Sequence, residues 1–358
     1  MPALADVALT AAADSSDLLA PWIAQYNTAA QNATTLANNY FLAPGVAWQQ
    51  MAANALGYLQ EWFNDPSSNS ITSIASQMQQ HLAAVLTGFG LTGASTDTTN
   101  AVLWHTLTGV QLPDGSDGHL WLLQNIGQYL PPGTDPAPVT SVLELLSSPL
   151  SGIVMGLLGP AVSPWVALLN SVTDGDGFSQ TLANMVGAVF NGADLNLGSL
   201  IPLIEHAGFL PEGLSVTNLD IAFGGWLTPG SVVAGPYQMT GSNGDIVALV
   251  PAVGGSIFNS VGVGLRGAPG YPYPGGDAVD ISSQAVGPLG ALEAWGQIVG
   301  VLLGSGWNDG ATGYPEPPVD VTPPLAGVTF PTIPGDDGGM SALATDVSGW
   351  FQDISAAL

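Results

Sequence analysis

Two short acidic loops are the parts of this sequence whose residue types and spacing best suit chemistry. The first holds Asp174 and Asp176 in the string DGDG, and the second holds Asp114 and Asp117 in the string DGSDG. Aspartate carboxylates in a tight, glycine-containing loop are typical ligands of Ca²⁺. Both loops lack the later glutamate of an EF-hand loop, so solvated turns are the simpler interpretation. A weak calcium site is the alternative.

Arg266 is the one Lys or Arg side chain among 358 residues, against 27 Asp and Glu and a formal net charge of −26. Polyanion binding needs several Lys or Arg side chains that displace counterions. We therefore expect no nucleic acid and no nucleotide as a partner, but cations, neutral solutes or apolar partners. A lone Arg beside so many acids is expected to be a structural cation, buried against a carboxylate.

The motifs of common hydrolases are missing from the sequence. No two of the four histidines have the i, i+4 spacing of a helical zinc site, and no G-x-S-x-G string is present. There is no cysteine, which excludes thiolate chemistry and cysteine metal sites. The sequence predicts that the protein is not an enzyme and needs no cofactor.

The composition indicates a protein of the cell envelope. Only 8% of the residues are charged and 46% are hydrophobic, whereas soluble domains carry about 25% charged residues. The first residues have neither a basic segment nor a long apolar core, so they are not an intact signal peptide. We expect an exported protein that begins after a removed leader.

Hydrophobic periodicity predicts an α+β fold that is mainly helical. A flexible tail is expected over 1–15 and a helical domain over 16–212, with clear amphipathic helices at 46–63 and 70–87. The uncharged stretch 145–173 is long enough to span a bilayer, but three prolines interrupt it. It is therefore expected to form two or three short buried helices.

A change to alternating apolar residues predicts a small antiparallel β unit over about 213–283. With the helix that follows, it is expected to form a second domain over 213–308. Residues 246–266 should form a hairpin. Its apolar members are Val250, Phe258, Val261, Val263 and Leu265. Two interpretations stay open: a hairpin that faces lipid in an oligomer, or an ordinary half-buried hairpin packed on the helical domain.

The end of the chain is expected to stand apart from both domains. Residues 309–337 are rich in Pro and Gly and predict an extended linker. Residues 338–358 predict an amphipathic helix that docks on the body, on another subunit or on a lipid interface.

Several strings, taken together, resemble the GjpA-like outer-membrane porin family of mycolic-acid-bearing actinobacteria. They are LAPGV at 42–46, LDIAFGG at 219–225, LTPG at 227–230, PAVGGS at 251–256 and GPLGA at 287–291. The resemblance covers most of the chain and implies an exported protein with a water-filled channel in the outer membrane. A barrel closes only with at least about eight strands, so a channel here would need a homo-oligomer.

The leading hypothesis from the sequence is thus an oligomeric, porin-like channel for small hydrophilic solutes or cations at the outer membrane or cell surface. The alternative is a non-channel envelope scaffold or a lipid-binding protein. The expected partners are outer-membrane lipid, other envelope proteins or further copies of the chain.

Overall fold

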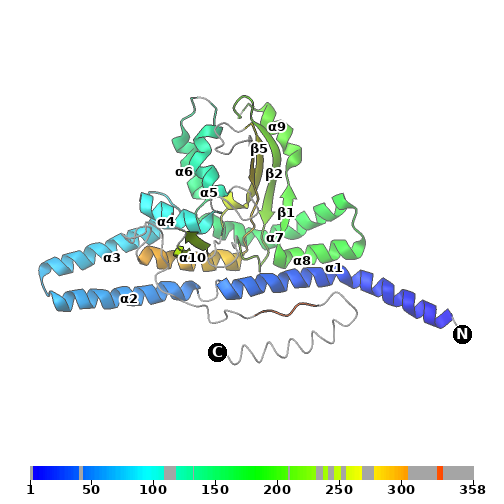
Figure 1. Ribbon diagram of the computed structural model, residues 1–358, viewed down its shortest axis with the longest axis horizontal. Coiled ribbons are helices and arrows are strands. Elements are labelled where there is room, and N and C mark those ends of the chain that lie inside the picture. The colour runs from blue at the N-terminus through cyan, green and yellow to red at the C-terminus, as the bar shows by residue number, and fades with distance from the viewer. Residues whose placement is uncertain are drawn as a thin grey trace.

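The computed structural model describes most of the chain and is mainly helical (Figure 1). The described residues are 3–39, 43–108, 118–131, 133–208, 210–230, 237–240, 246–250, 255–267, 278–304 and 329–333. Small antiparallel sheets accompany the helices, so the predicted α+β fold, mainly α, is confirmed. Apart from 329–333, the predicted linker and C-terminal helix lie outside the described residues.

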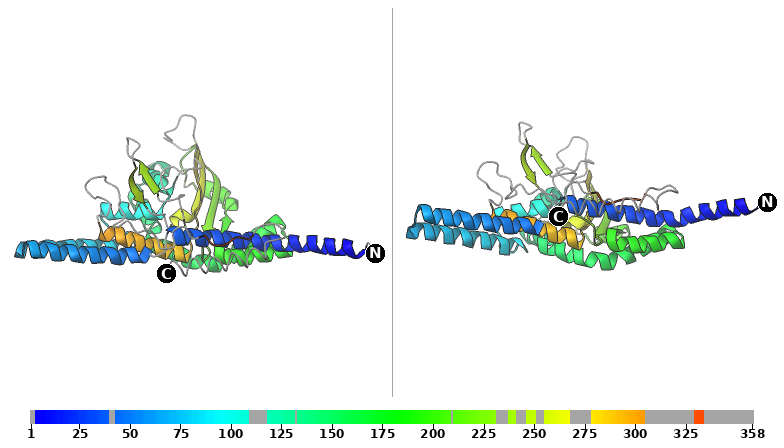
Figure 2. Two further views of the ribbon diagram at one scale, coloured as in Figure 1. Left: turned by 60° about the horizontal axis from the view of Figure 1, so that its bottom comes forward. Right: turned by 90° about the horizontal axis from the view of Figure 1, so that it is seen from below.

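The six longest described helices lie in one layer, which Figure 2 (left) shows edge-on. They are α1 (Ala3–Asn39), α2 (Ala43–Asn64), α3 (Ser68–Gly88), α7 (Pro149–Asp174), α8 (Phe178–Asn191) and α10 (Pro288–Leu303). The remaining elements stand on one side of this helical layer and form what we call the cap. The α-helices of the cap are α4 (Thr96–Thr106), α5 (His119–Asn125), α6 (Pro136–Leu146) and α9 (Ile201–His206).

The main sheet of the cap has four antiparallel strands in the order β1-β2-β5-β6. They are β1 (Ala193–Asn196), β2 (Ser215–Phe223), β5 (Val261–Arg266) and β6 (Ala278–Ile281). The strands β3 (Tyr237–Thr240) and β4 (Ile246–Val250) pair with each other. The predicted hairpin over 246–266 is therefore wrong, because its two halves belong to different sheets. A hydrogen-bonded turn, in which Ser260 N–H donates to the Ser256 carbonyl at 3.1 Å, precedes β5.

Helix α7 runs without a break through 26 residues, which corrects the prediction of several short helices. Ser148 caps its start by accepting from the Ser151 N–H, and Gly175 ends it in the left-handed conformation with φ 75°. Pro160 and Pro164 each remove one backbone donor. The helix continues past them because its inner face is held against the cap, where the Ser163 hydroxyl lies 3.2 Å from the Phe223 and Gly224 carbonyls.

Three glycines let the backbone of the cap approach α7 closely. Gly152, Gly156 and Gly159 lie on its buried inner face. A Cβ atom added at Gly159 would lie 2.1 Å from the Gly224 carbonyl oxygen, and one at Gly152 would lie 2.3 Å from the Gly255 carbonyl oxygen. At these three positions a Cβ atom would overlap the backbone of the loops, so the glycine stripe allows the close approach of the cap to α7.

One hydrophobic core joins the two halves of the chain. It contains Leu103 and Leu120 from the first half together with Leu265, Ile281 and Ile298 from the second. The expected boundary at 212/213 therefore does not separate two independent cores. Long-range strand and helix contacts, which periodicity does not report, bring the two segments together.

Helix α1 begins at Ala3, where a flexible tail to residue 15 was expected. Its first turns are rich in Ala and Leu, which have high helix propensity. Farther along, Asn27 exchanges two hydrogen bonds with the backbone of Ile333, and Thr34 accepts one from the Phe330 N–H at 2.9 Å. Residues 329–333 thus lie along α1.

Candidate functional site

The acidic loops do not form a metal centre among the described residues, where no group of three or more His, Asp or Glu side chains could hold an ion. Asp174 and Asp176 lie in the turn between α7 and α8. Asp176 accepts from the Asn184 side-chain amide at 3.1 Å, which is a structural contact. Asp114 and Asp117 lie outside the described residues, so the predicted loop around them is not tested.

Arg266 ends β5 with an exposed side chain, so the expectation that it is buried against a carboxylate is wrong. Within the described part of the chain it forms no ion pair. β5 is an inner strand, and the backbone of Arg266 at its end pairs with Ser215 of β2 and Ala278 of β6.

The residues predicted to face lipid or an interface instead contribute to the core where they are described. Phe258 and Leu265 are buried in the main core, and Val263 packs against it. Val261 is half-buried, and its carbonyl oxygen accepts from the His119 ring at 2.7 Å. For Val250 the structure describes the backbone, in β4, and not the side chain. Of the two interpretations, packing on the helical body is the one these contacts favour.

His119 connects the helices of the cap to the sheet. Its Nε2 atom lies 2.7 Å from the Val261 carbonyl oxygen and its Nδ1 atom 2.9 Å from the Thr108 hydroxyl. A carbonyl only accepts, so Nε2 carries the proton and the Thr108 hydroxyl donates to Nδ1. Burial lowers the pKa of His119 to about 4, opposed by the Val261 hydrogen bond and the charge of Asp220. His119 is therefore a neutral structural group.

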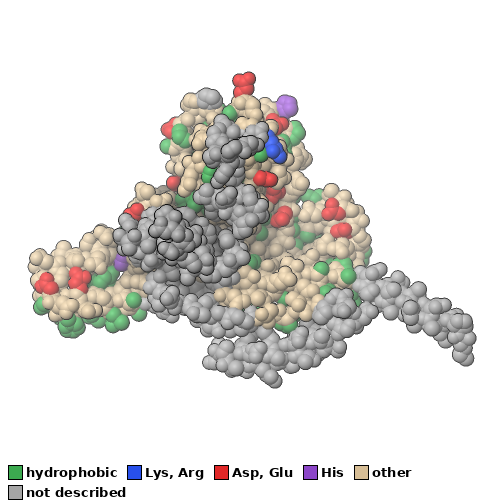
Figure 3. Space-filling view, viewed as in Figure 1, with side chains coloured by type: hydrophobic (Ala, Val, Ile, Leu, Met, Phe, Trp, Pro, Cys, Tyr) green, Lys and Arg blue, Asp and Glu red, His purple; other side chains and the backbone are tan. Residues whose placement is uncertain are grey.

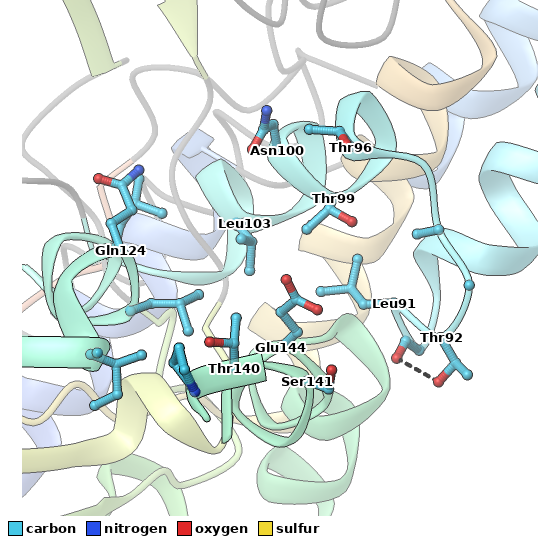
Figure 4. Close-up of a pocket in the computed structure, with 18 residues that line it drawn as sticks. Leu91, Thr92, Thr96, Thr99, Asn100, Leu103, Gln124, Thr140, Ser141 and Glu144 are labelled. Atoms are coloured by element: carbon cyan, nitrogen blue, oxygen red, sulfur yellow. Dashed lines mark hydrogen bonds between the residues drawn. The ribbon is translucent and has the colours of Figure 1, made fainter. Parts of the chain in front are cut away.

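A cavity of about 710 Å³ opens between α4, α5 and α6 (Figure 4). Its floor is apolar and includes the buried side chains of Leu91, Leu103, Leu120 and Leu123. This volume falls within the range of about 300–1,000 Å³ of small-molecule sites. The cavity lies in the cap, and its described lining includes none of the site residues that the sequence singled out.

One carboxylate lies among the polar side chains that line the cavity. Figure 4 shows the carboxyl group of Glu144 pointing into the cavity, with Thr99 and Thr140 on either side of it. These three side chains, with those of Asn100 and Gln124, make no hydrogen bond to any other described residue. Burial raises the pKa of the Glu144 carboxyl above its ordinary value. Among the described residues that line the cavity, Glu144 is the one with a charged side chain.

A second unusual surface lies on the outside of the α7–α8 pair. Seven large apolar side chains of α7 and four of α8 are exposed at helical spacing. They are Leu150, Val154, Leu157, Leu158, Trp165, Leu169 and Val172, followed by Phe178, Leu182, Val186 and Phe190. We call them the outer apolar face. A monomeric soluble protein rarely exposes a continuous apolar patch of more than a few hundred Å².

The outer apolar face is turned away from the other described helices and from the cap. On α7 it lies opposite the stripe of Gly152, Gly156 and Gly159 that contacts the cap. On α8 it lies opposite Gly187 and Asn191, which meet Gln25 of α1. No charged residue occurs in α8 or in α7 before Asp174. The face is thus apolar along its whole length.

The neighbouring helices α2 and α3 also expose large apolar side chains. Periodicity predicts buried apolar stripes on both, yet several of their large side chains are exposed. They are Trp48, Met51, Leu56, Leu59 and Phe63 of α2 and Ile71, Met78, Leu82 and Leu86 of α3. Figure 3 shows hydrophobic side chains along the lower edge of these helices and acidic side chains on the cap and near both ends of the layer.

Among the described residues, α7 is the one helix long and apolar enough to cross a membrane. Only 39% of its apolar window is buried inside the protein. The core helix of a soluble protein passes the same test of length and composition. The decisive feature is therefore which sides of α7 are covered: the cap covers one side, and the other is the outer apolar face.

Glu293 in α10 is a buried carboxylate that should make stability depend on pH. Its Oε2 atom has no hydrogen-bond partner among the described residues, and burial raises its pKa to about 7. The folded state thus favours the protonated form, so the stability that Glu293 contributes is fully present below about pH 4.5 and is lost as pH rises through about 7. We expect the Tm of the wild type to fall relative to that of Glu293→Gln between pH 5 and 8, as followed by circular dichroism.

The control for this experiment is Glu212→Gln, which removes the same charge from an exposed turn before β2. Its Tm should run parallel to that of the wild type across the pH range. A Glu293→Gln variant that also runs parallel would show that the carboxyl of Glu293 is ionised with little penalty in the folded protein.

Sequence reasoning missed both the cavity and the outer apolar face. The cavity draws its lining from three helices, and Glu144 carries no motif that would mark it. The sequence did contain a signal for the outer apolar face. The stretch 145–173 lacks charged residues on every side of a helix, whereas a helix that packs on one side needs only one uncharged stripe. Comparison with protein-family models, with curated proteins and with solved structures gives no match for this chain.

Proposed function

We propose that the protein is an exported cell-envelope protein that lies on a lipid layer through its outer apolar face. The observation that carries the proposal is the row of exposed apolar side chains along α7 and α8, opposite the cap. Amphipathic helices that lie in a membrane interface bury one such face among the acyl chains. The resemblance to outer-membrane porins supports the same location, the outer membrane or cell surface.

An orientation parallel to the lipid layer suits α7 better than one that crosses the lipid. The inner face of α7 contacts backbone carbonyls of the cap, and the cap carries charged residues such as Asp220 and Asp280. A perpendicular α7 would draw these groups into the hydrocarbon, where unsatisfied polar groups are costly. When the helical layer lies flat (Figure 2), the cap stays in water.

Charge selects the kind of lipid. Proteins held by anionic headgroups use Lys and Arg, and this chain has one Arg and a net charge of −26. We therefore expect neutral or zwitterionic lipid and attraction by apolar burial alone. Transfer of eleven half-exposed large side chains is worth on the order of 10 kcal/mol before the cost of immobilisation.

The test is flotation with vesicles of phosphatidylcholine, with and without phosphatidylglycerol. Wild-type protein should float with the neutral vesicles at any salt concentration. It should float less with the anionic vesicles at low salt, because the net charge is repelled, and salt should restore binding by screening. Leu169→Asp on the outer apolar face should lower flotation at least tenfold, since a charge is costly to bury.

The matched control is Leu203→Asp in α9, which places the same charge on another exposed leucine, in the cap. It should float like the wild type. Equal loss in both variants would argue against the outer apolar face as the contact. If Leu169→Asp instead converted a stable dimer to a monomer in sedimentation and the wild type did not float, the face would be an interface between copies of the chain.

A channel, as the resemblance implies, would require several subunits, because a closed barrel takes at least about eight strands. Planar-bilayer recording on the same preparations tests it directly. Discrete, cation-selective conductance steps from wild type would favour the porin-like function over lipid-surface binding alone.

A further inference from the structure

We propose that the cavity between α4, α5 and α6 binds a small organic cation, in which an ammonium group sits on an apolar body and pairs with Glu144. No motif in the sequence marks this site, and it is independent of lipid binding. The cavity lies in the cap, so a ligand could occupy it while the helical layer rests on a lipid surface.

The polar half of the cavity has the chemistry to bind an ammonium group. The carboxyl group of Glu144 points into the cavity, and the side chains of Thr99 and Thr140 also line it (Figure 4). An ammonium group has three donors and no acceptor, so it can pair with the carboxylate and still donate to further oxygen atoms or water in the cavity. None of the three side chains is hydrogen-bonded to another described residue, so binding displaces no internal contact.

The floor of the cavity has the chemistry to bind the apolar body. Leu103, Leu120 and Leu123 are buried beneath the polar groups, and Ile126 extends this surface. An alkyl or aromatic group on them would remove apolar area from water on both partners. A purely polar ligand such as a sugar would leave this floor without a partner of its own kind.

Charge decides between the alternatives. An anionic ligand would meet a carboxylate with no cation in the lining. A neutral ligand would leave Glu144 desolvated and unpaired, and the raised pKa of its carboxyl reflects that penalty. A ligand that carries a positive charge removes this penalty, because it pairs with the carboxylate. A charge-assisted hydrogen bond in a partly dry site is also stronger than a neutral one.

The test uses three probes that share a 2-phenylethyl body and differ in the polar group: 2-phenylethylammonium, 2-phenylethanol and 3-phenylpropanoate. We expect calorimetric titration of the full chain at pH 8 to give one site for the ammonium probe. The alcohol should bind about tenfold more weakly, in line with the loss of one charge-assisted hydrogen bond, and the carboxylate should not bind measurably. Amide chemical shifts around Leu103 and Thr140 should change on titration.

Two variants separate this site from general attraction to an acidic protein. Glu144→Gln keeps the shape of the cavity and should weaken the ammonium probe about tenfold while leaving the alcohol unchanged. Asp97→Asn removes an exposed carboxylate from the same helix as Thr99, outside the cavity, and should leave both unchanged. Equal binding of ammonium and alcohol to the wild type, or equal weakening by the two variants, would overturn the proposal.

Discussion

Gly159→Ala should destabilise the protein by about 3 kcal/mol or more, although alanine is the better helix former. The added Cβ atom would lie 2.1 Å from the carbonyl oxygen and 3.0 Å from the carbonyl carbon of Gly224. These are backbone atoms, so no rotamer change relieves the overlap. The loop must move away from α7, which disturbs the hydrogen bonds from the Ser163 hydroxyl to the Phe223 and Gly224 carbonyls. Urea unfolding followed by tryptophan fluorescence measures the loss.

Gly57→Ala is the matched control, because Gly57 lies inside α2 with nothing within 4 Å of an added Cβ atom. The same substitution should there stabilise the protein by about 0.5–1 kcal/mol through helix propensity. The two variants should thus shift the urea midpoint in opposite directions. A Gly159→Ala variant that gains stability would mean that the cap does not rest directly on the α7 backbone.

Most of the helices could be predicted because their signals are local. Ser67 and Ser95 cap α3 and α4, and Pro288 stands in the first turn of α10. Such signals depend only on residues within one turn, so one sequence is enough to find them. The predicted helix over 70–87 accordingly differs from α3 by two residues at its start and one at its end.

The continuity of α7 could not be predicted in the same way. Pro160 and Pro164 are local helix breakers. The contacts that offset them come from three glycines at least 60 residues farther along the chain, Gly224, Gly255 and Gly287. The pairing of β5 with the distant β2 rather than with the preceding β4 is likewise a long-range choice. Periodicity reports which residues share a face and does not report what that face meets.

For the same reason, apolar stripes were expected to be buried where several are exposed. Phe63 in α2 and Trp165 in α7 carry the apolar spacing of a core helix, yet they are 71% and 67% exposed. A stripe that packs on protein and one that packs on lipid have the same period. Only the arrangement of the six helices in one layer, with the cap on one side, distinguishes them.

His119→Ala should cost about 3–4 kcal/mol of folding free energy, the second large effect. The substitution removes the donor to the Val261 carbonyl and the acceptor for the Thr108 hydroxyl, and both groups stay in a dry environment. It also removes the edge-to-face contact with Phe258, whose ring centre lies 5.4 Å away. His206→Ala, at an exposed position of α9, should change stability by less than about 0.5 kcal/mol.

The pH dependence separates the hydrogen bonds of His119 from its volume. Its pKa is about 4 in the folded protein, against an ordinary value of 6.5 in the unfolded chain, so protons bind the unfolded state more strongly. The stability that His119 contributes is therefore fully present above pH 6.5 and is lost as pH falls to about 4, a change of roughly 3 kcal/mol. His119→Gln keeps a donor for the Val261 carbonyl but cannot titrate, so its deficit relative to the wild type should shrink as pH falls from 7 to 5. The pKa of buried His105 is also lowered by burial, but both proteins keep this residue, so it does not affect the difference. A deficit that stays constant with pH would mean that His119 titrates normally in the folded protein.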